Sequence, residues 1–341
     1  MAEIIIPLSV RVSIGSAILL GLTQGTLNVK PTTVYLLTYH KTKCSADCGF
    51  CSQARSSKSR DDLLSRVTWP IFQLDYVVAK LKLAVEKKLI DRICIQVMNY
   101  PNVFDEILEL VRRLHLELST PISISCQPLD LKQIKKLAES GIDRIGIPLD
   151  TPTKELFKRV KGKPYVWESQ IEALENAVQI LGRGRVSTHL IVGLGERDDE
   201  LLRMIQRMID MGVYPSLFAF TPIRGTRLEK LSQPPFIRYR MIQLAHYLIT
   251  NIKTRIENMS FDEDGFIIDF GVDDEMLRGV ISLGTPFVTS GCPGCNRPYY
   301  NERPGGPLYN YPQKPNYEEL IEIKRTISGE TRLKWLKIGE F

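Results

Sequence analysis

Six short runs of apolar residues are spaced along the chain, with longer amphipathic stretches between them. The runs are nearly continuous in hydrophobicity, which is typical of parallel strands buried on both faces. They occupy residues 33–39, 92–97, 121–126, 144–149, 186–193 and 216–223. The pattern therefore predicts a set of parallel strands.

The stretches between the runs carry apolar residues at i, i+3 and i+4, the spacing of a helix with one buried face. They cover residues 74–87, 104–115, 130–140, 168–181 and 198–212. Regular alternation of strand and helix predicts an α/β fold with a parallel sheet. Two weaker runs, 266–270 and 286–289, would raise the number of strands to eight. We therefore expect a (β/α)8 barrel in preference to a partial barrel of six strands, with its chemistry at the C-terminal ends of the strands.

Three regions are expected around this alternation. They are an N-terminal helical extension (1–30), the barrel (31–290) and a C-terminal tail with a final helix (291–341). The tail is too rich in Pro, Gly and Tyr for a helix or a central strand until the helical pattern at 316–325. A disordered linker is the alternative, but the aromatic residues and a Cys pair favour an ordered and functional tail.

Composition excludes several classes of protein. Apolar residues make up 43% and charged residues 25% of the 341 residues, as in an ordinary globular protein. The apolar stretch 17–22 is far shorter than the roughly 20 residues of a membrane span, and no signal peptide is evident. The net charge of +6 is spread out, without the dense basic tract of a nucleic-acid-binding protein. We expect a cytoplasmic protein that binds neither membrane nor nucleic acid, whose seven cysteines are metal ligands rather than disulfides.

The most specific motif is a CxxxCxxC run at Cys44, Cys48 and Cys51, directly after the first apolar run. It supplies three thiolates, whereas iron–sulfur clusters are usually held by four and structural zinc prefers CxxC pairs. Three unrelated loop thiols are the plain alternative. The motif resembles that of the radical S-adenosylmethionine (SAM) enzymes. The resemblance implies that the triad holds a [4Fe–4S] cluster whose open iron chelates SAM, with Phe50 as the aromatic residue before the last Cys.

The same resemblance assigns a SAM pocket. Ile191, Gly193 and Glu196 match the fifth-strand motif of the superfamily, which backs the adenine. Asp150 follows the fourth strand and matches the carboxylate that accepts the ribose hydroxyls. The alternatives are a routine strand-to-helix turn for the first group and a helix N-cap for Asp150. His189 stands two residues from Ser187 on the same strand face, and we assign it no role.

Four cysteines remain, Cys94, Cys126, Cys292 and Cys295. Each has a plain alternative, because buried free Cys acts as a small hydrophobic residue and a CxxC can hold zinc or cycle as a redox pair. Residues 33–226 resemble biotin synthase, which holds an auxiliary [2Fe–2S] cluster with three Cys and one Arg. Cys94 and Cys126 match two of those ligands, whereas Ser187 stands at the third. We therefore expect all four cysteines to hold an auxiliary cluster of the [4Fe–4S] type, with the tail folded across the barrel mouth.

A biotin synthase-like barrel combined with a C-terminal segment that carries Cys292 and Cys295 looks like the archaeal-type two-component lipoyl synthases. That resemblance implies a sulfurtransferase that inserts sulfur from the auxiliary cluster into an octanoyl chain on a lipoyl carrier protein. A second radical SAM component and an electron donor such as ferredoxin would be its partners. Three alternatives stay open: biotin synthase-like insertion into a small molecule, a radical SAM activity without sulfur transfer, and a zinc-bound scaffold.

Overall fold

A parallel sheet forms the centre of the computed structural model, which describes residues 8–302 and 305–329. Its six parallel strands are β2 (Thr33–Thr38), β6 (Arg92–Gln96), β7 (Ile122–Ser125), β8 (Arg144–Gly146), β9 (Val186–Val192) and β10 (Val213–Ala219). They lie side by side in the order β10-β9-β8-β7-β6-β2. All residues of β2 are buried, as expected for a strand covered on both faces.

Two antiparallel strands extend the sheet beyond β2. They are β1 (Ser9–Val12), which pairs with β2, and β5 (Ile71–Gln73), which pairs with β1. The expected parallel α/β fold is confirmed, and the sheet does have eight strands. The two weak runs, however, are not the seventh and eighth: β12 (Ile267–Asp269) pairs only with β11 (Ser260–Phe261), and residues 285–287 form a 3-10 helix, η3 (Thr285–Phe287). Within the described residues no pairing joins β10 to β5, so the barrel is partial.

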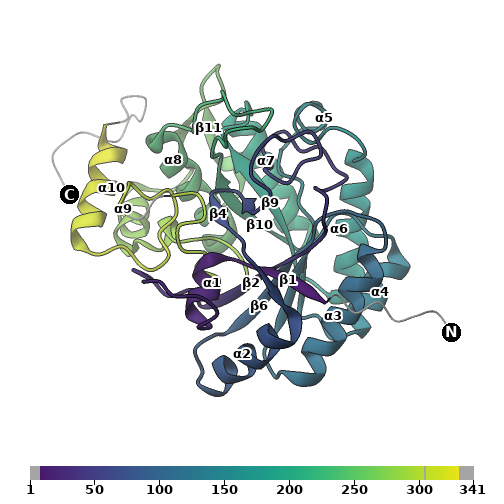
Figure 1. The fold of residues 1–341 in the computed structure, drawn as a ribbon. Coiled ribbons are helices and arrows are strands. Elements are labelled where there is room, and N and C mark those ends of the chain that lie inside the picture. Colours follow the sequence, from purple (N-terminus) through teal and green to yellow (C-terminus); the bar gives the residue numbers. More distant parts are fainter. Residues whose placement is uncertain (1–7, 303–304, 330–341) are drawn as a thin grey trace.

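Helices cover the outer face of the sheet. In Figure 1, α3, α4 and α6 pack next to one another on one side of the molecule, whereas α8, α9 and α10 gather on the other. The helices are α1 (Ile14–Leu19), α2 (Leu74–Glu86), α3 (Val103–Glu117), α4 (Leu131–Glu139), α5 (Lys154–Lys161), α6 (Trp167–Leu181), α7 (Asp198–Met211), α8 (Phe236–Tyr247), α9 (Asp274–Leu283) and α10 (Tyr317–Ser328). The remaining elements are short: β3 (Leu63–Leu64), β4 (Val67–Thr68), the π-helix η1 (Leu248–Ile252) and the 3-10 helix η2 (Ile256–Asn258).

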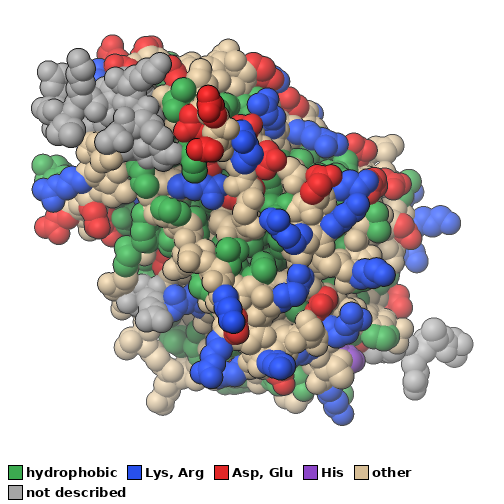
Figure 2. Space-filling model, turned by 90° about the horizontal axis from the view of Figure 1, so that it is seen from above, with side chains coloured by type: hydrophobic (Ala, Val, Ile, Leu, Met, Phe, Trp, Pro, Cys, Tyr) green, Lys and Arg blue, Asp and Glu red, His purple; other side chains and the backbone are tan. Residues whose placement is uncertain are grey.

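The distribution of charged side chains on the surface and the lengths of the helices agree with the expectations from composition. Figure 2 shows Lys and Arg side chains spread over one face with acidic side chains between them. Across residues 8–302 and 305–329, no helix combines the length and the apolar character that crossing a membrane requires.

Candidate active site

The CxxxCxxC loop follows the C-terminal end of β2 and is folded as a tight turn. The backbone N–H of Cys51 donates to the carbonyl of Cys48 at 3.0 Å, and that of Cys44 donates to the carbonyl of Gln53 at 2.9 Å. The Asn99 N–H donates to Cys44 Sγ at 3.2 Å. Burial raises the pKa of Cys48 to about 11 and that of Cys51 to about 12. A cluster bound here would therefore have to displace protons from these thiols.

Three of the residues expected in the SAM pocket line one cavity beside this loop. Phe50, Asp150 and Ile191 border it together with Cys51, and its volume is about 200 Å³. Asp150 follows the end of β8 but stays in register with β9, because its N–H donates to His189 O and its carbonyl accepts from Ile191 N–H. Its φ of +67° is a strained value for a residue other than glycine. Strain of this kind is found where a side chain must be aimed.

A buried lysine, which the sequence did not single out, pairs with Asp150. Lys161 ends α5, is fully buried, and places Nζ 2.5 Å from Asp150 Oδ2. Burial alone would lower the pKa of Lys161, but Asp150 and the nearby Cys48 outweigh it, so this pKa is raised. Lys161 is thus a buried cation that pairs with Asp150 and lies near Cys48. No sequence signal in α5 was strong enough to predict this role.

Gly193 and Glu196 shape the turn after β9 instead of lining the cavity. The Glu196 carboxylate accepts from the N–H groups of Gly193 and Leu194 at 2.8 Å each, and it pairs with Arg238 at 2.9 Å. Gly193 has a φ of +104°, and a Cβ there would lie 2.8 Å from Pro234 Cδ. Both residues therefore have a structural reason for their identity, and a contact with SAM stays a prediction.

The tail CxxC lies at the opposite end of the barrel, beneath the N-terminal end of β2. The Thr32 N–H donates to the side-chain oxygen of Asn296 at 3.1 Å, and the Asn296 amide donates to Lys30 O at 2.9 Å. Cys292 and Cys295 border the same cavity as Cys51, and Cys94 of β6 joins them there. The expectation that the tail crosses the barrel mouth is therefore wrong for its cysteines: three thiols meet at the barrel floor.

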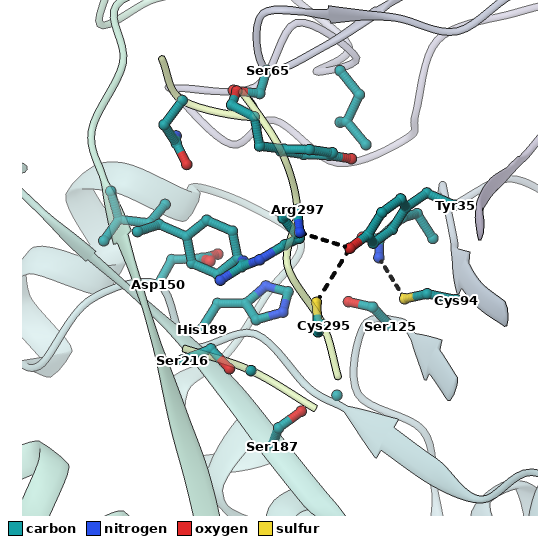
Figure 3. A pocket seen from close by; sticks show the side chains of 18 of the residues that line it. Tyr35, Ser65, Cys94, Ser125, Asp150, Ser187, His189, Ser216, Cys295 and Arg297 are labelled. Atoms are coloured by element: carbon teal, nitrogen blue, oxygen red, sulfur yellow. Dashed lines mark hydrogen bonds between the residues drawn. The ribbon is translucent and has the colours of Figure 1, made fainter. Parts of the chain in front are cut away.

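Between floor and mouth, residues 290–301 contact both β10 and the Tyr35 side chain of β2. On the β10 side, Ser290 Oγ accepts from Leu217 N–H at 2.8 Å and the Asn301 amide donates to Ala219 O at 2.9 Å. On the β2 side, the Arg297 N–H donates to the Tyr35 hydroxyl at 3.1 Å. Figure 3 shows this segment passing between His189 and Ser216 on one side and Cys94 and Ser125 on the other. The tail thus closes the side that the sheet leaves open.

Cys126 does not join the other three cysteines. It is 3% exposed and packs in the hydrophobic core, whereas its neighbours Ser123 and Ser125 line the cavity. Strand alternation explains the difference, because Cys126 shares its face with the core residues Ile122 and Ile124. Burial alone raises the pKa of its thiol to about 12. Of the four cysteines expected to share an auxiliary cluster, the structure thus brings three to the cavity and places Cys126 in the core.

Other side chains around the three thiols are polar. Arg297, which directly follows the CxxC-Asn sequence, lies with its guanidinium carbon 3.9 Å from the centre of the Phe218 ring. His189 points into the same cavity, and its ring centre is 4.9 Å from that of Phe218. Burial lowers the pKa of His189 to about 4, so its imidazole is neutral at pH 7. The cavity is therefore lined by two arginines, Arg144 and Arg297, and by one neutral imidazole, together with the three thiols.

Both ends of the cavity fit an iron–sulfur cluster by donor chemistry. All seven cysteines are free, and six of them divide into the loop triad and the floor trio. No three His, Cys, Asp or Glu side chains of the described residues surround one point closely enough to hold a single metal ion. A cluster spreads its ligands over several iron atoms and needs a wider arrangement.

Residues 38–208 match the Radical SAM superfamily, a range that includes the Cys triad, Asp150 and the Gly193 turn. The chain belongs to this superfamily and is a radical SAM enzyme. Biotin synthase of Prochlorococcus marinus (strain NATL1A) is 24% identical over 229 residues, 65% of this chain and 63% of that protein. Biotin synthase of Acinetobacter calcoaceticus is 28% identical over 270 residues, 75% of this chain and 78% of that protein.

The chain thus spans less than two thirds of the first of these relatives. Among solved structures, the FeFe-hydrogenase maturase HydG from Carboxydothermus hydrogenoformans has a TM-score of 0.50 at 16% identity. The likeness covers 66% of this chain and 53% of that one. At this identity the likeness shows the fold alone. The superfamily implies a [4Fe–4S] cluster and SAM, for which the triad would supply thiolates and the cavity beside it the lining residues Phe50, Asp150 and Ile191.

Proposed function

We propose that the protein inserts sulfur into an acyl chain carried by a partner protein, as a component of a lipoyl synthase. The observation that carries the proposal is the presence of two thiol sets at opposite ends of one cavity. Cys51 of the triad borders the mouth end, and Cys94, Cys292 and Cys295 border the floor. A substrate carbon between the two ends can face both a hydrogen-abstracting centre and a sulfur source.

The cofactors supply the chemistry, and the chain's own residues organise it. When bound, the triad cluster with SAM supplies a radical that takes hydrogen from an unactivated carbon, and the floor cluster supplies sulfide. Asp150 would accept hydrogen bonds from the ribose hydroxyls of SAM, while Lys161 holds its carboxylate in place. Phe50 and Ile191 form apolar walls beside it. Residues 290–301 close the open side and exclude water from the reacting groups.

The cavity lining supports an acyl chain as the substrate. Between mouth and floor it presents apolar side chains to an entering chain, among them Ile145, Phe218 and Phe220. The triad end lies at the C-terminal ends of the strands, where barrel enzymes receive substrate. In the proposal, an octanoylated lipoyl carrier protein docks at the mouth. A second radical SAM component and a donor such as ferredoxin complete the system.

The test is mass spectrometry of an octanoyl-lysine carrier peptide after anaerobic incubation with the reduced, reconstituted protein and SAM. The proposal predicts a mass gain of sulfur in place of hydrogen on the octanoyl chain. Cys94→Ala should lose the sulfur product while it still forms 5′-deoxyadenosine. Cys126→Ala is the matched control and should keep both. Sulfur insertion into a free small molecule instead of the peptide would contradict the acyl-carrier substrate, and a Cys94→Ala protein that still inserts sulfur would contradict the floor thiols as the site of the sulfur source.

A further inference from the structure

Each thiol at the barrel floor has its own side-chain hydrogen-bond donor. Gln96 Nε2 donates to Cys94 Sγ at 3.1 Å. Ser123 Oγ lies 3.6 Å from Cys292 Sγ, and the Tyr35 hydroxyl lies 3.3 Å from Cys295 Sγ. The donors come from β2, β6 and β7, the rigid strands that form this wall of the barrel. The arrangement is therefore fixed by the sheet.

Two of the donors are oriented by a third group. Arg92 Nη1 donates to Ser123 Oγ at 2.8 Å and is itself held 2.6 Å from Asp143 Oδ2. Because Ser123 accepts from Arg92, its own proton is free to point at Cys292.

The Tyr35 hydroxyl on β2 is oriented in the same way. The Arg297 N–H donates to the Tyr35 oxygen at 3.1 Å, which leaves the phenol proton for Cys295. A cysteine that ligates iron is a thiolate without a proton, so each of these contacts has the side chain as donor in the loaded protein.

The mouth differs from the floor in the kind of donor that it offers. The hydrogen bond to Cys44 comes from the backbone N–H of Asn99. Backbone donors are present whatever the side chain, whereas the floor donors depend on three particular residues. Hydrogen bonds to the sulfurs of an iron–sulfur cluster stabilise its more negative, reduced state and raise its reduction potential.

We propose that Tyr35, Gln96 and Ser123 are positioning residues that raise the reduction potential of the floor cluster. This inference rests on the proposed function, which places a cluster on Cys94, Cys292 and Cys295. When a carbon radical forms a bond to a sulfide, the product is a thiolate and one electron is left over. That electron reduces one ferric iron of the cluster to ferrous iron, so a higher potential favours bond formation.

The test measures the potential of the floor cluster alone. In the full-length protein with Cys44, Cys48 and Cys51 all changed to Ala, the only remaining cluster is the one at the floor, and its potential is followed by electron paramagnetic resonance during a redox titration. Tyr35→Phe should bind the same amount of iron and shift the midpoint to a lower potential. Ser123→Ala combined with Tyr35→Phe should shift it further. Ser65→Ala, which changes another cavity hydroxyl that donates to Tyr300 O at 3.1 Å, is the matched control and should leave the midpoint unchanged.

The outcomes separate this inference from the proposed function. An unmoved midpoint in Tyr35→Phe and in the double variant, at full iron content, would overturn the inference. Loss of iron in Tyr35→Phe, Gln96→Met and Ser123→Ala alike would also overturn it, because the donors would then serve retention of the cluster. A triad-free parent that binds no iron at all would instead contradict the floor cluster, and the proposed function with it.

Discussion

Asp150 Oδ2 and Lys161 Nζ lie 2.5 Å apart in a region where both side chains are buried. The pair joins the end of β8 to the end of α5, and it lies directly behind the surface that Asp150 presents to the cavity. Breaking a buried pair by changing one partner leaves an uncompensated charge in a poorly solvated place. The carboxylate therefore has two separable tasks, one toward Lys161 and one toward the cavity.

Asp150→Asn should lower the free energy of unfolding by about 3–5 kcal/mol, because the Lys161 cation loses its partner. Adding Lys161→Met should restore most of that loss. SAM affinity should stay reduced in both variants by about 1.5–3 kcal/mol, since the charge-assisted contact to the ribose is gone. Denaturant unfolding and calorimetry measure the two effects. If the double variant bound SAM with wild-type affinity, Asp150 would have no part in SAM binding and would serve only to pair with Lys161.

Cys48→Ala should abolish reductive SAM cleavage, because only Cys44 and Cys51 remain to hold the cluster at the mouth. The measurement is the rate of 5′-deoxyadenosine formation with dithionite as reductant. Cys126→Ala provides the control, since that thiol is buried in the core and away from both thiol sets. A Cys48→Ala protein that formed 5′-deoxyadenosine at the wild-type rate would show that the triad does not carry the reaction.

Gly193→Ala should destabilise the protein more than Gly182→Ala does. Both glycines have positive φ, +104° and +89°, so each substitution costs about 1–3 kcal/mol in backbone strain. A Cβ at Gly193 also meets Pro234 Cδ at 2.8 Å, whereas one at Gly182 meets nothing within 4 Å. The clash should add about another 1–3 kcal/mol. Equal unfolding free energies for the two variants would show that the turn at Gly193 can shift to make room for the added Cβ.

Stability should fall as the pH is lowered from about 6.5 toward 4. Burial lowers the pKa of His246 to about 4, and its Nε2–H donates to Pro215 O at 2.8 Å. Because this pKa lies below the unfolded value, the unfolded chain binds more protons in that range. The stabilisation is therefore present above pH 6.5 and lost below it. Between pH 7.5 and 5, His246→Gln should lose about 2 kcal/mol less than the wild type in denaturant unfolding. Parallel pH profiles would contradict the buried neutral imidazole.

The sequence predicted the parallel core because its strands carry a local signal. The run at 33–39 became β2 (Thr33–Thr38), and 186–193 became β9 (Val186–Val192). The last strand was predicted to begin at residue 216, but it begins at Val213 and includes Pro215. Proline is tolerated there because β10 is the edge of the sheet. The sequence of the weak runs 266–270 and 286–289 could not show that they stay out of the central sheet. Whether a weak run joins a sheet depends on which other segments pack beside the edge strand.

The site shows the same division between local and distant information. The CxxxCxxC loop is contiguous in sequence, so its three thiols could be predicted to lie together. Cys126 was misassigned although alternation offered a correction, since Ser123 and Ser125 mark the inward face of β7. Lys161 and the three floor donors were missed because nothing local distinguishes a buried Lys or Gln from an exposed one. Their roles arise only when α5 meets Asp150 and when the tail meets β2.

The packing of residues 290–301 against β10 and β2 brings together cysteines that are far apart in sequence. The mouth ligands lie in one loop of eight residues, Cys44 to Cys51, although Asn99 and Val160 also hold it by hydrogen bonds. Cys94 meets Cys292 and Cys295 only when the tail packs against β2, β7 and β10. Closing such a long loop costs entropy before its contacts repay it. We therefore expect the loop triad to converge at a smaller entropy cost than the floor trio.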